Sequence, residues 1–265
     1  MREIEWPLVT INILAFNRKE EVSITIDKIY NELDYPKNRI EIIVVDNASS
    51  DGTSDFINRC YPDIKLIKLS VNIGISGWNV GFANGRGDYF LVLDDDSCVE
   101  SGLKEAISYL EKKKKVGVLG CQITGGAFTT KAMVHLQDWW GFIGAGAIIR
   151  RELYEAIGGF SEWIFLYSHE WDYGIRVLDS GFNIKYFQNC IVDHRTSKIN
   201  RSNYRLRKFT TRNELGIIKS YFNGLDKILL YLRTIFWNCV AERQDGIIGI
   251  VPIISGCWDF LFLKI

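Results

Sequence analysis

The first hundred residues alternate between short apolar runs and helical patterns. Runs typical of buried strands occupy residues 8–16, 40–45, 64–69 and 89–93, with helical patterns between them. Strands that alternate with helices through short connections form a parallel sheet, which helices cover on both faces. Ligands of such sheets bind at the carboxyl ends of the strands. We therefore expect an α/β fold with its functional site at that edge.

Polar clusters follow all four apolar runs, as a site at this edge requires. They are Asn17 with Arg18, Asp46 with Asn47, Asn72 with Gly74, and the acidic triplet at 94–96. Because the carboxyl ends of parallel strands meet at one edge, these clusters are expected to lie close together. Their convergence is better evidence for a ligand site than any one motif.

The acidic triplet consists of Asp94, Asp95 and Asp96 and closes the run at 89–93. Three adjacent carboxylates repel one another, and burial adds to the cost of their charge. Asp94 and Asp96 lie on the same side of an extended chain, so both can face one divalent cation. The alternative is a solvated turn or helix cap, since Ser97 and the acids precede a helix expected to start near Ser101.

The pattern changes after Val116. Strands are predicted at 116–123 and 183–192. Between them, a stretch rich in tryptophan and glycine leads to 148–151, and the pattern is helical from Asn203 onward. A second acidic cluster, at 167–176, coincides with a predicted helix start. We divide the chain into a catalytic domain at 1–202 and a C-terminal helical extension at 203–265. The catalytic domain has a nucleotide half, residues 1–100, and an acceptor half, residues 101–202.

Composition excludes some classes of protein. The formal net charge is zero, so no nucleic-acid partner is expected. The six cysteines form no C-x-x-C pair, which indicates reduced, mostly buried thiols in a cytosolic protein. Residues 1–7 lack the apolar stretch of a signal peptide.

A set of short segments resembles the family-2 glycosyltransferases of the GT-A fold, in particular bacterial rhamnosyl- and galactofuranosyltransferase-like members. In chain order the segments are FNR at 16–18, VVDNASSDG at 44–52, NIG at 72–74 with Asn79, LDDD at 93–96, IGGF at 157–160, HEWD at 169–172 with Arg176, His194, and RN at 212–213. Each segment is common by chance, whereas the ordered set is specific. The resemblance implies a mixed, mainly parallel sheet flanked by helices.

The resemblance implies inverting transfer of a sugar from a nucleotide-diphosphate donor, of the UDP or dTDP type, to an acceptor hydroxyl. Mn²⁺ or Mg²⁺ would stabilise the departing diphosphate. Asp96 is the first choice as metal ligand, and Asp94 shares the metal or contacts the ribose. Asp95 hydrogen-bonds the donor or orients its neighbours. His194 is implied as a further metal ligand, since a mixed oxygen and nitrogen set suits Mn²⁺.

Donor contacts are also implied at the other polar clusters. Asp46 would accept from the base imide or a ribose hydroxyl, although the same acid also suits an Asx-turn. Backbone and amide contacts to the nucleotide would come from Ala15, Phe16, Asn17, Arg18, Asn72, Gly74 and Asn79.

An acceptor hydroxyl needs a base when it attacks, and the candidates are Glu170 and Asp172. Counting back from Arg176, Glu170 occupies the position of the family's usual catalytic aspartate, and His169 replaces the usual glutamate. This departure leaves both acids open, with Glu170 preferred. Helix capping is the alternative role for one of them.

Two further regions concern the acceptor. Trp139 and Trp140 fall where the acceptor subsite of related enzymes begins, and indole rings stack on sugar faces as readily as they fill cores. The apolar stretches at 228–240 and 246–265 suit contact with the cytoplasmic leaflet of the inner membrane, which would fit a glycan or lipid-linked glycan acceptor. Packing on the catalytic domain or on a second subunit of a homo-oligomer is the alternative.

These features predict a metal-dependent inverting glycosyltransferase for a surface polysaccharide or similar glycoconjugate, cytoplasmic or peripheral to the membrane. A sugar-nucleotide nucleotidyltransferase is the first alternative, but the segment 15–19 lacks the glycine of a phosphate loop. A degenerate binding subunit of a glycan-assembly complex is the second, but both acidic clusters are present.

Overall fold

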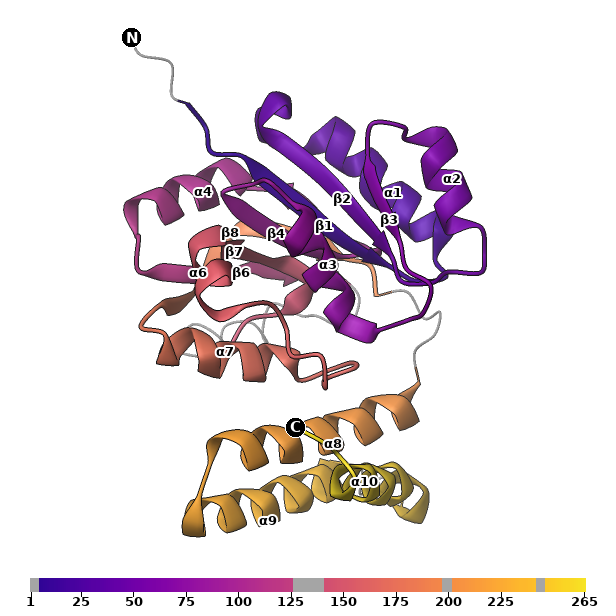
Figure 1. Cartoon of the computed structure of the whole chain (residues 1–265), viewed down its shortest axis with the longest axis vertical. Helices are drawn as coiled ribbons and strands as arrows, with labels where there is room; N and C mark the ends of the chain where they lie inside the picture. The colour runs from indigo at the N-terminus through magenta and orange to yellow at the C-terminus, as the bar shows by residue number, and fades with distance from the viewer. Residues whose placement is uncertain (1–4, 126–140, 197–201, 242–245) are drawn as a thin grey trace.

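The computed structural model describes residues 5–125, 141–196, 202–241 and 246–265. Within these residues, helices cover an eight-stranded sheet, and a helical layer follows it (Figure 1). The strands are β1 (Val9–Ala15), β2 (Ile40–Asp46), β3 (Lys65–Lys68), β4 (Tyr89–Asp94), β5 (Ser97–Ser101), β6 (Val116–Thr124), β7 (Ala147–Arg150) and β8 (Asn183–His194). The α-helices are α1 (Lys19–Glu32), α2 (Thr53–Cys60), α3 (Gly77–Asn84), α4 (Leu103–Lys112), α6 (Arg151–Ile157), α7 (His169–Asp179), α8 (Asn203–Tyr221), α9 (Gly224–Ala241) and α10 (Gly246–Leu261). Short 3-10 turns are η1 (Lys37–Arg39), η2 (Gly74–Ser76) and η3 (Gly144–Gly146).

The strand order is β3-β2-β1-β4-β7-β6-β8-β5. Strands β3, β2, β1 and β4 run parallel, as do β6 and β8, whereas β7 and β5 pair antiparallel with their neighbours. The predicted mixed, mainly parallel sheet is therefore confirmed. The predicted strands of the first half all form, because β-branched and apolar residues dominate each run.

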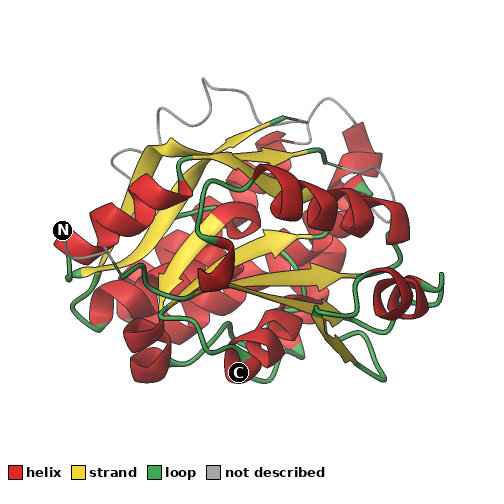
Figure 2. Cartoon of the chain, turned by 90° about the horizontal axis from the view of Figure 1, so that it is seen from above, coloured by secondary structure: helices red, strands yellow, loops and turns green. Residues whose placement is uncertain are grey.

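Hydrophobic residues fill both faces of the sheet. Leu91 and Leu93 of β4 pack in a cluster with α1 and α4, whereas Phe90 and Val92 pack in a second cluster with α3 and α7. Successive side chains of a strand point to opposite faces, so a strand that is buried on both sides reads as a continuous apolar run. Seen from above, the strands lie between helices on both sides (Figure 2).

Two local features of the structure were not predicted. The segment after the acidic triplet, for which a helix cap was the alternative, forms strand β5, and α4 begins at Leu103, close to the expected start near Ser101. β5 pairs antiparallel with β8, a contact between segments almost a hundred residues apart. His194 was expected after a strand and is instead the last residue of β8. The pairing with β5 extends β8 by two residues and places His194 opposite Ser97.

The cysteines are free, as expected, but they differ in burial. Cys98, Cys121 and Cys190 are buried, whereas Cys60 is exposed and the remaining two are half-buried. The cysteines on the sheet strands are therefore buried, as expected, whereas those on the helices are not fully buried.

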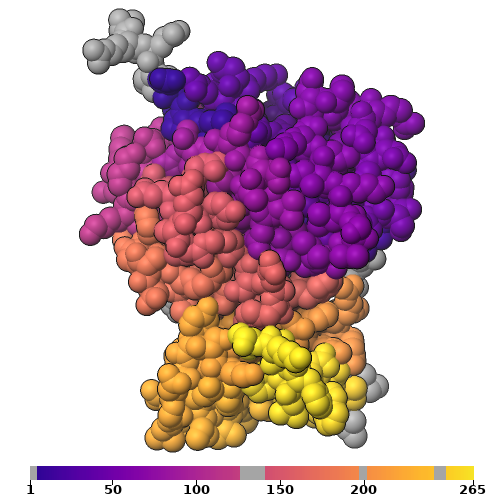
Figure 3. Space-filling model, in the orientation of Figure 1, coloured from indigo at the N-terminus to yellow at the C-terminus, as the bar shows by residue number. Residues whose placement is uncertain are grey.

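The layer formed by α8, α9 and α10 lies beyond α7, at one end of the molecule (Figures 1 and 3). Ser202 caps α8 by accepting a hydrogen bond from the Arg205 amide at 3.2 Å. The buried Asn213 side chain joins α8 to the sheet domain by donating to the carbonyls of Leu166, at 2.7 Å, and Tyr167, at 2.9 Å. The division of the chain at residue 202 stays a prediction.

Candidate active site

The carboxyl ends of β1, β2 and β4 bring the first polar clusters together. In register, Ala15 lies beside Asp46, and Leu14 lies beside Asp94. The residues that follow β1 therefore lie between the acids that end β2 and β4. This is the edge at which a parallel sheet binds its ligands.

Asp94, Asp96 and His194 form one cluster, in which each residue offers a ligand atom within 4.8 Å of the others. The Nε2 atom of His194 lies 3.1 Å from Asp96 Oδ1 and 3.6 Å from Asp94 Oδ2. Asp96 and His194 are buried, and Asp94 is partly exposed. Two carboxylates and an imidazole that converge in this way fit a divalent cation such as Mn²⁺, which accepts oxygen and nitrogen ligands. The partial exposure of Asp94 leaves this cluster accessible from one side.

The middle residue of the triplet has a different environment. The Oδ1 atom of Asp95 lies 2.9 Å from Arg18 NH1, and its Oδ2 accepts the Phe16 amide at 3.1 Å. Burial raises the pKa of Asp95 to about 7, against the opposing effect of the Arg18 charge and with a further contribution from Asp96. Arg18 also reaches Asp96 Oδ2 at 3.3 Å. Asp95 therefore joins the segment after β1 to the cluster of Asp94, Asp96 and His194, in line with an orienting role.

The loops after β1 and β2 are tied together. Asp46 is fully buried and accepts hydrogen bonds from the Ser54 hydroxyl and from the Ser49 amide, the latter at 2.8 Å. Asn17, which has a φ of 53°, accepts the Ser50 amide at 2.7 Å. The Ser49 amide is three residues on from Asp46, so this contact closes the loop one residue wider than the Asx-turn that the composition favours. The predicted contact of Asp46 with the nucleotide stays a prediction.

Asn47 holds the next loop in place. Its Oδ1 accepts the Ile73 amide at 2.9 Å, and its Nδ2 donates to the Gly74 carbonyl at 3.0 Å. The Oδ1 atom of Asn72 accepts the Gly74 amide at 2.9 Å, so side chains bind both backbone groups of this glycine. The loop after β3 is therefore fixed against the loop after β2.

Two of the predicted donor contacts are engaged within the protein. The Asn79 side chain accepts the Phe160 amide at 2.8 Å and donates to the Phe160 carbonyl at 2.7 Å. The Ala15 carbonyl accepts the Asn47 amide at 2.8 Å. In this structure both residues bind other parts of the protein, and contact with a donor stays a prediction for them.

A cavity of about 130 Å³ lies against these loops. Its lining includes six of the predicted donor-site residues, namely Phe16, Arg18, Asn72, Gly74, Asp94 and Asp95. It also includes Asn47 of the second polar cluster and Ile75 and Trp78 of the segment 72–79. The sequence predicted no such role for the remaining lining residues, which are Leu14, Phe165, Leu166 and Arg205. Arg205 comes from the start of α8 and adds a cation to a wall that already holds Arg18. In the sequence, the feature that could have indicated Arg205 is the basic stretch at the start of α8.

Gly74 is a cavity-lining residue at which the structure leaves no room for a side chain. It has a φ of +67°, and a Cβ atom there would collide with the Phe165 carbonyl. That carbonyl also accepts the Ile75 amide at 2.9 Å, so it cannot move without loss of a hydrogen bond.

We expect Gly74→Ala to lower the free energy of unfolding by about 3 kcal/mol, measured by chemical denaturation. Gly52→Ala is the matched control, because Gly52 has a φ of +84° but open space around its Cβ. The control should cost only the left-handed strain, about 1 kcal/mol. Equal losses for the two variants would show that the contact with Phe165 does not restrict this loop.

Glu170 lies in the first turn of α7. Its Oε1 accepts the Gly144 amide at 3.2 Å, and its Oε2 lies 3.3 Å from His169 Nδ1. The side chain is 22% exposed, so it is oriented by the protein yet accessible from solvent. These are the properties that a general base requires.

Asp172, the second candidate base, is buried and fully engaged. Its Oδ2 accepts the Ser161 hydroxyl at 2.7 Å and Arg176 NH2 at 3.1 Å, and its Oδ1 accepts the Tyr221 hydroxyl at 2.8 Å. Tyr221 comes from the end of α8, so Asp172 joins α7 to the helical layer. The geometry supports Glu170 as the base and a structural role for Asp172.

His169 occupies an aromatic environment beside Glu170. Its ring lies 5.7 Å from Trp78 and 5.1 Å, edge to face, from Phe160. Trp78 also lines the cavity, so the second acidic cluster adjoins the predicted donor site through this ring. An added Cβ at Gly144 would lie 2.6 Å from His169 Nε2, so the imidazole leaves no room for a side chain there.

The segment that leads into α7 is strained. Tyr167 and Ser168 have φ values of 67° and 60°, which are uncommon for residues other than glycine. The hydrogen bond from Asn213 to the Tyr167 carbonyl and the Arg212 contact to the Trp163 carbonyl, at 2.8 Å, hold this segment. The RN pair of the sequence therefore fixes the approach to the second acidic cluster.

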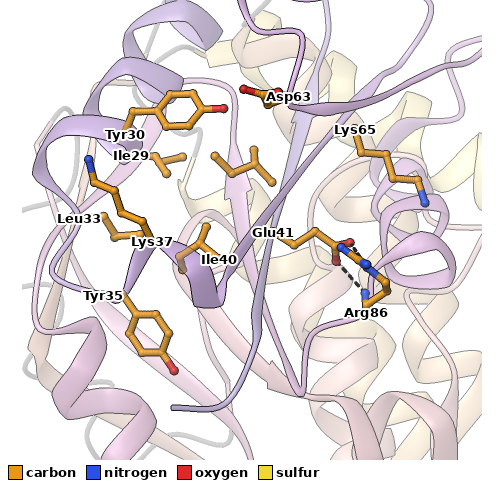
Figure 4. Close-up of a pocket in the computed structure, with 11 residues that line it drawn as sticks. Ile29, Tyr30, Leu33, Tyr35, Lys37, Ile40, Glu41, Asp63, Lys65 and Arg86 are labelled. Atoms are coloured by element: carbon orange, nitrogen blue, oxygen red, sulfur yellow. Dashed lines mark hydrogen bonds and ion pairs between the residues drawn. The ribbon is translucent and has the colours of Figure 1, made fainter. Parts of the chain in front are cut away.

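The predicted acceptor residues Trp139 and Trp140 lie outside the described residues. A larger hollow, of about 610 Å³, lies elsewhere, between the end of α1 and the beginnings of β2 and β3 (Figure 4). Its lining includes Tyr30, Lys37 and the ion pair between Arg86 and Glu41, but none of the predicted site residues. Because it is at the amino ends of the strands, it is separate from the acidic clusters.

Comparison with known proteins identifies the family and related folds. The family model for glycosyl transferase family 2 matches residues 10–175. A probable glycosyltransferase of Bacillus subtilis (strain 168), YdaM, is 30% identical over 218 residues, which is 71% of this chain and 50% of the relative. The Escherichia coli UDP-Glc:alpha-D-GlcNAc-diphosphoundecaprenol beta-1,3-glucosyltransferase WfaP is 32% identical over 111 residues, which is 40% of this chain and 43% of the relative. The chain spans half or less of the length of these relatives.

Solved structures share the fold. The mannosyltransferase PcManGT from Pyrobaculum calidifontis, in complex with GDP-Man and Mn²⁺, superposes with a TM-score of 0.67 at 18% identity, covering 96% of this chain and 74% of that one. A fragment of Staphylococcus aureus TarS in complex with UDP-GlcNAc gives a TM-score of 0.66 at 16% identity, covering 96% and 80%. The segment that the family model matches contains the acidic triplet and the two candidate bases, and it ends before His194. With a family model that covers more than half of its residues and a GT-A architecture, the chain belongs to glycosyltransferase family 2.

Proposed function

We propose that this chain transfers a sugar from a nucleotide-diphosphate sugar to an acceptor hydroxyl, with inversion at the anomeric carbon. The observation that carries the proposal is the placement of the Asp94, Asp96 and His194 cluster at the edge of the sheet, beside a cavity with Arg18 and Arg205 in its walls. A nucleotide diphosphate is anionic, so cationic side chains and a bound cation both favour its binding.

Asp94, Asp96 and His194 would hold Mn²⁺ or Mg²⁺, and a bound cation supplies positive charge that stabilises the departing diphosphate. The donor set supports this assignment, because its three ligand atoms are clustered and Asp94 is accessible. Arg18 and Arg205 would add charge-assisted hydrogen bonds to the donor. Asp95 would keep Arg18 in position through their 2.9 Å contact.

Glu170 would be the general base. As the acceptor oxygen bonds to the anomeric carbon, its proton passes to the Glu170 carboxylate. The bond from that carbon to the diphosphate breaks on the opposite face of the sugar, which inverts the configuration. The Gly144 amide holds the carboxylate by a hydrogen bond, and His169 Nδ1 lies 3.3 Å from its second oxygen, so little reorganisation is needed when the proton arrives.

The relatives support a role in the synthesis of a surface polysaccharide or a similar glycoconjugate. PcManGT was solved with GDP-Man, TarS with UDP-GlcNAc, and WfaP is named for transfer from UDP-Glc to a diphosphoundecaprenol-linked sugar. We extend to this chain a donor of the UDP or dTDP type and a glycan or lipid-linked glycan acceptor.

Thermal unfolding with UDP, GDP, dTDP and CDP, each with and without Mn²⁺, tests the donor site. We expect stabilisation by UDP or dTDP that requires Mn²⁺, because a cation held by Asp94, Asp96 and His194 would offset the negative charge of the diphosphate. A nucleotide at a hundred times its Kd adds about 2.7 kcal/mol to the free energy of unfolding. Stabilisation by none of the four would contradict a donor site in this chain and favour a degenerate binding subunit.

A further inference from the structure

The C-terminal layer carries an unusual amount of exposed apolar surface. Of the eighteen large apolar side chains that are exposed in the described part of the chain, fourteen fall within 202–265. Among them are Trp237 and Trp258, which are 57% and 63% exposed. Scattered apolar residues on a surface are ordinary, but a concentration of this kind in one layer marks an interaction surface.

The exposed residues follow helical periodicity along α9 and α10. On α9 they are Leu225, Ile228, Leu229, Leu232, Phe236 and Trp237, and on α10 they are Val251, Ile254, Trp258 and Leu261. Spacings of three and four place these residues on one face of each helix, except Trp237, which follows Phe236 and lies at the edge of the α9 face. We call these two faces the outer apolar surface.

The opposite faces of the two helices make the contacts within the layer. Asn238 of α9 is buried and donates to Glu214 of α8 at 3.1 Å, and Gly256 of α10 packs against the backbone of α8. The rings of Tyr231 on α9 and Phe260 on α10 are in contact, with their centroids 5.6 Å apart. Both helices lie on the side of α8 that faces away from the sheet (Figure 1). The contacts within the layer therefore use the opposite faces of α9 and α10 and leave the outer apolar surface exposed to solvent.

Charge is distributed unevenly along the chain. Residues 202–265 contain nine lysines and arginines against five acidic residues, a net charge of +4, whereas the rest of the chain carries −4. Arg233 and Lys264 are exposed near the outer apolar surface, as is Asp226 in the first turn of α9. Two of the acids are shielded, since Asp259 pairs with Lys208 at 2.9 Å and burial raises the pKa of Glu214. The outer apolar surface therefore belongs to a helical layer whose net charge is positive.

We propose that the outer apolar surface docks on an anionic lipid bilayer, with α9 and α10 lying in the plane of the interface. Apolar residues and tryptophans on one side of a helix pair, in a layer of positive net charge, are the combination that this environment favours, because indoles and cationic side chains suit the headgroup region. No helix of the described residues is long and apolar enough to span a membrane. A symmetric contact with a second copy is disfavoured, since it would bring two layers of net charge +4 together.

Co-sedimentation with vesicles tests this proposal independently of transfer activity. We expect the wild-type chain to bind vesicles of equal parts phosphatidylglycerol and phosphatidylcholine at least tenfold more tightly than phosphatidylcholine vesicles, and to be released by added salt. The Trp237→Glu/Trp258→Glu variant should lose at least tenfold in binding. The matched control is Ile24→Glu/Leu178→Glu, which adds the same two charges at exposed apolar positions of α1 and α7 and should bind as the wild type does.

Sedimentation velocity and circular dichroism complete the test. Circular dichroism establishes that each variant is folded, and a Trp237→Ser/Trp258→Ser variant replaces the first if that one is not. Absence of wild-type binding overturns the proposal, and a dimer that the tryptophan variant dissociates would assign the surface to a second copy. Binding that the tryptophan variant retains overturns the location, and equal binding to both vesicle types overturns the role of charge.

Discussion

The Asp96→Asn variant is expected to lose about a thousandfold in turnover with Mn²⁺ present, the largest effect that a single substitution in the acidic cluster should have. Asp96 is fully buried, and its two oxygens face His194 and Arg18 at 3.1 and 3.3 Å. Asparagine keeps the shape of the side chain but removes its negative charge. The variant should therefore lose metal affinity without a large rearrangement.

A second measurement separates this effect from unfolding. In a chelator, the variant should unfold at a temperature equal to or above that of the wild type, because one of three adjacent carboxylates has been neutralised. Added Mn²⁺ should stabilise the wild type and leave the variant unchanged.

Asp193→Asn is the matched control for this prediction. Asp193 precedes His194 on β8, but its carboxylate lies 3.5 Å from Lys28 and is not part of the cluster of Asp94, Asp96 and His194. We expect the control to keep both turnover and stabilisation by Mn²⁺. An Asp96→Asn variant that behaves like the control would rule out the acidic cluster as the metal site.

Much of the fold could be predicted because it depends on local patterns. The apolar runs of β1, β2 and β4 are buried on both faces, so each is readable without knowledge of its neighbours. The rule that ligands bind at the carboxyl ends of parallel strands then placed Asp46 and Asp94 at one edge, where the register has them beside β1.

The parts that could not be predicted depend on contacts between distant segments. β5 is a short strand of mixed polarity, and it exists because β8 pairs with it, so its own residues read equally well as a helix cap. The role of Arg205 depends on where α8 begins relative to the cavity. Asp172 resembled a base by spacing alone, and only the folded chain brings Tyr221 to its free oxygen.

The three acids of the triplet have different partners in the folded chain, which the sequence alone could not show. Asp94, Asp95 and Asp96 are identical in type, yet the turn after β4 directs Asp95 to Arg18 and the other two to His194. Sequence spacing could suggest that Asp94 and Asp96 share a ligand. It could not show that Asp95 would be held by the Phe16 amide, because that contact crosses between strands.

The Glu170→Gln variant is the second substitution with a large expected effect, a loss of about 10² to 10⁴ in kcat. Glutamine can still accept the Gly144 amide, so the position of the side chain is retained while its capacity to take a proton is lost. Because Glu170 does not line the predicted donor cavity, stabilisation by nucleotide and Mn²⁺ should stay at the wild-type level. The fall should therefore appear in kcat with little change in the affinity for the donor.

Asp172→Asn should show the reverse pattern, which makes it the natural comparison. Its carboxylate joins Ser161, Arg176 and Tyr221, so the substitution should lower the free energy of unfolding by about 2 kcal/mol. The folded fraction at low temperature should keep most of its turnover. If Asp172→Asn abolishes turnover at wild-type stability while Glu170→Gln remains active, the base is Asp172. If both variants keep full activity, the proton of the acceptor is removed by a group outside this acidic pair, and the assignment of a base to α7 fails.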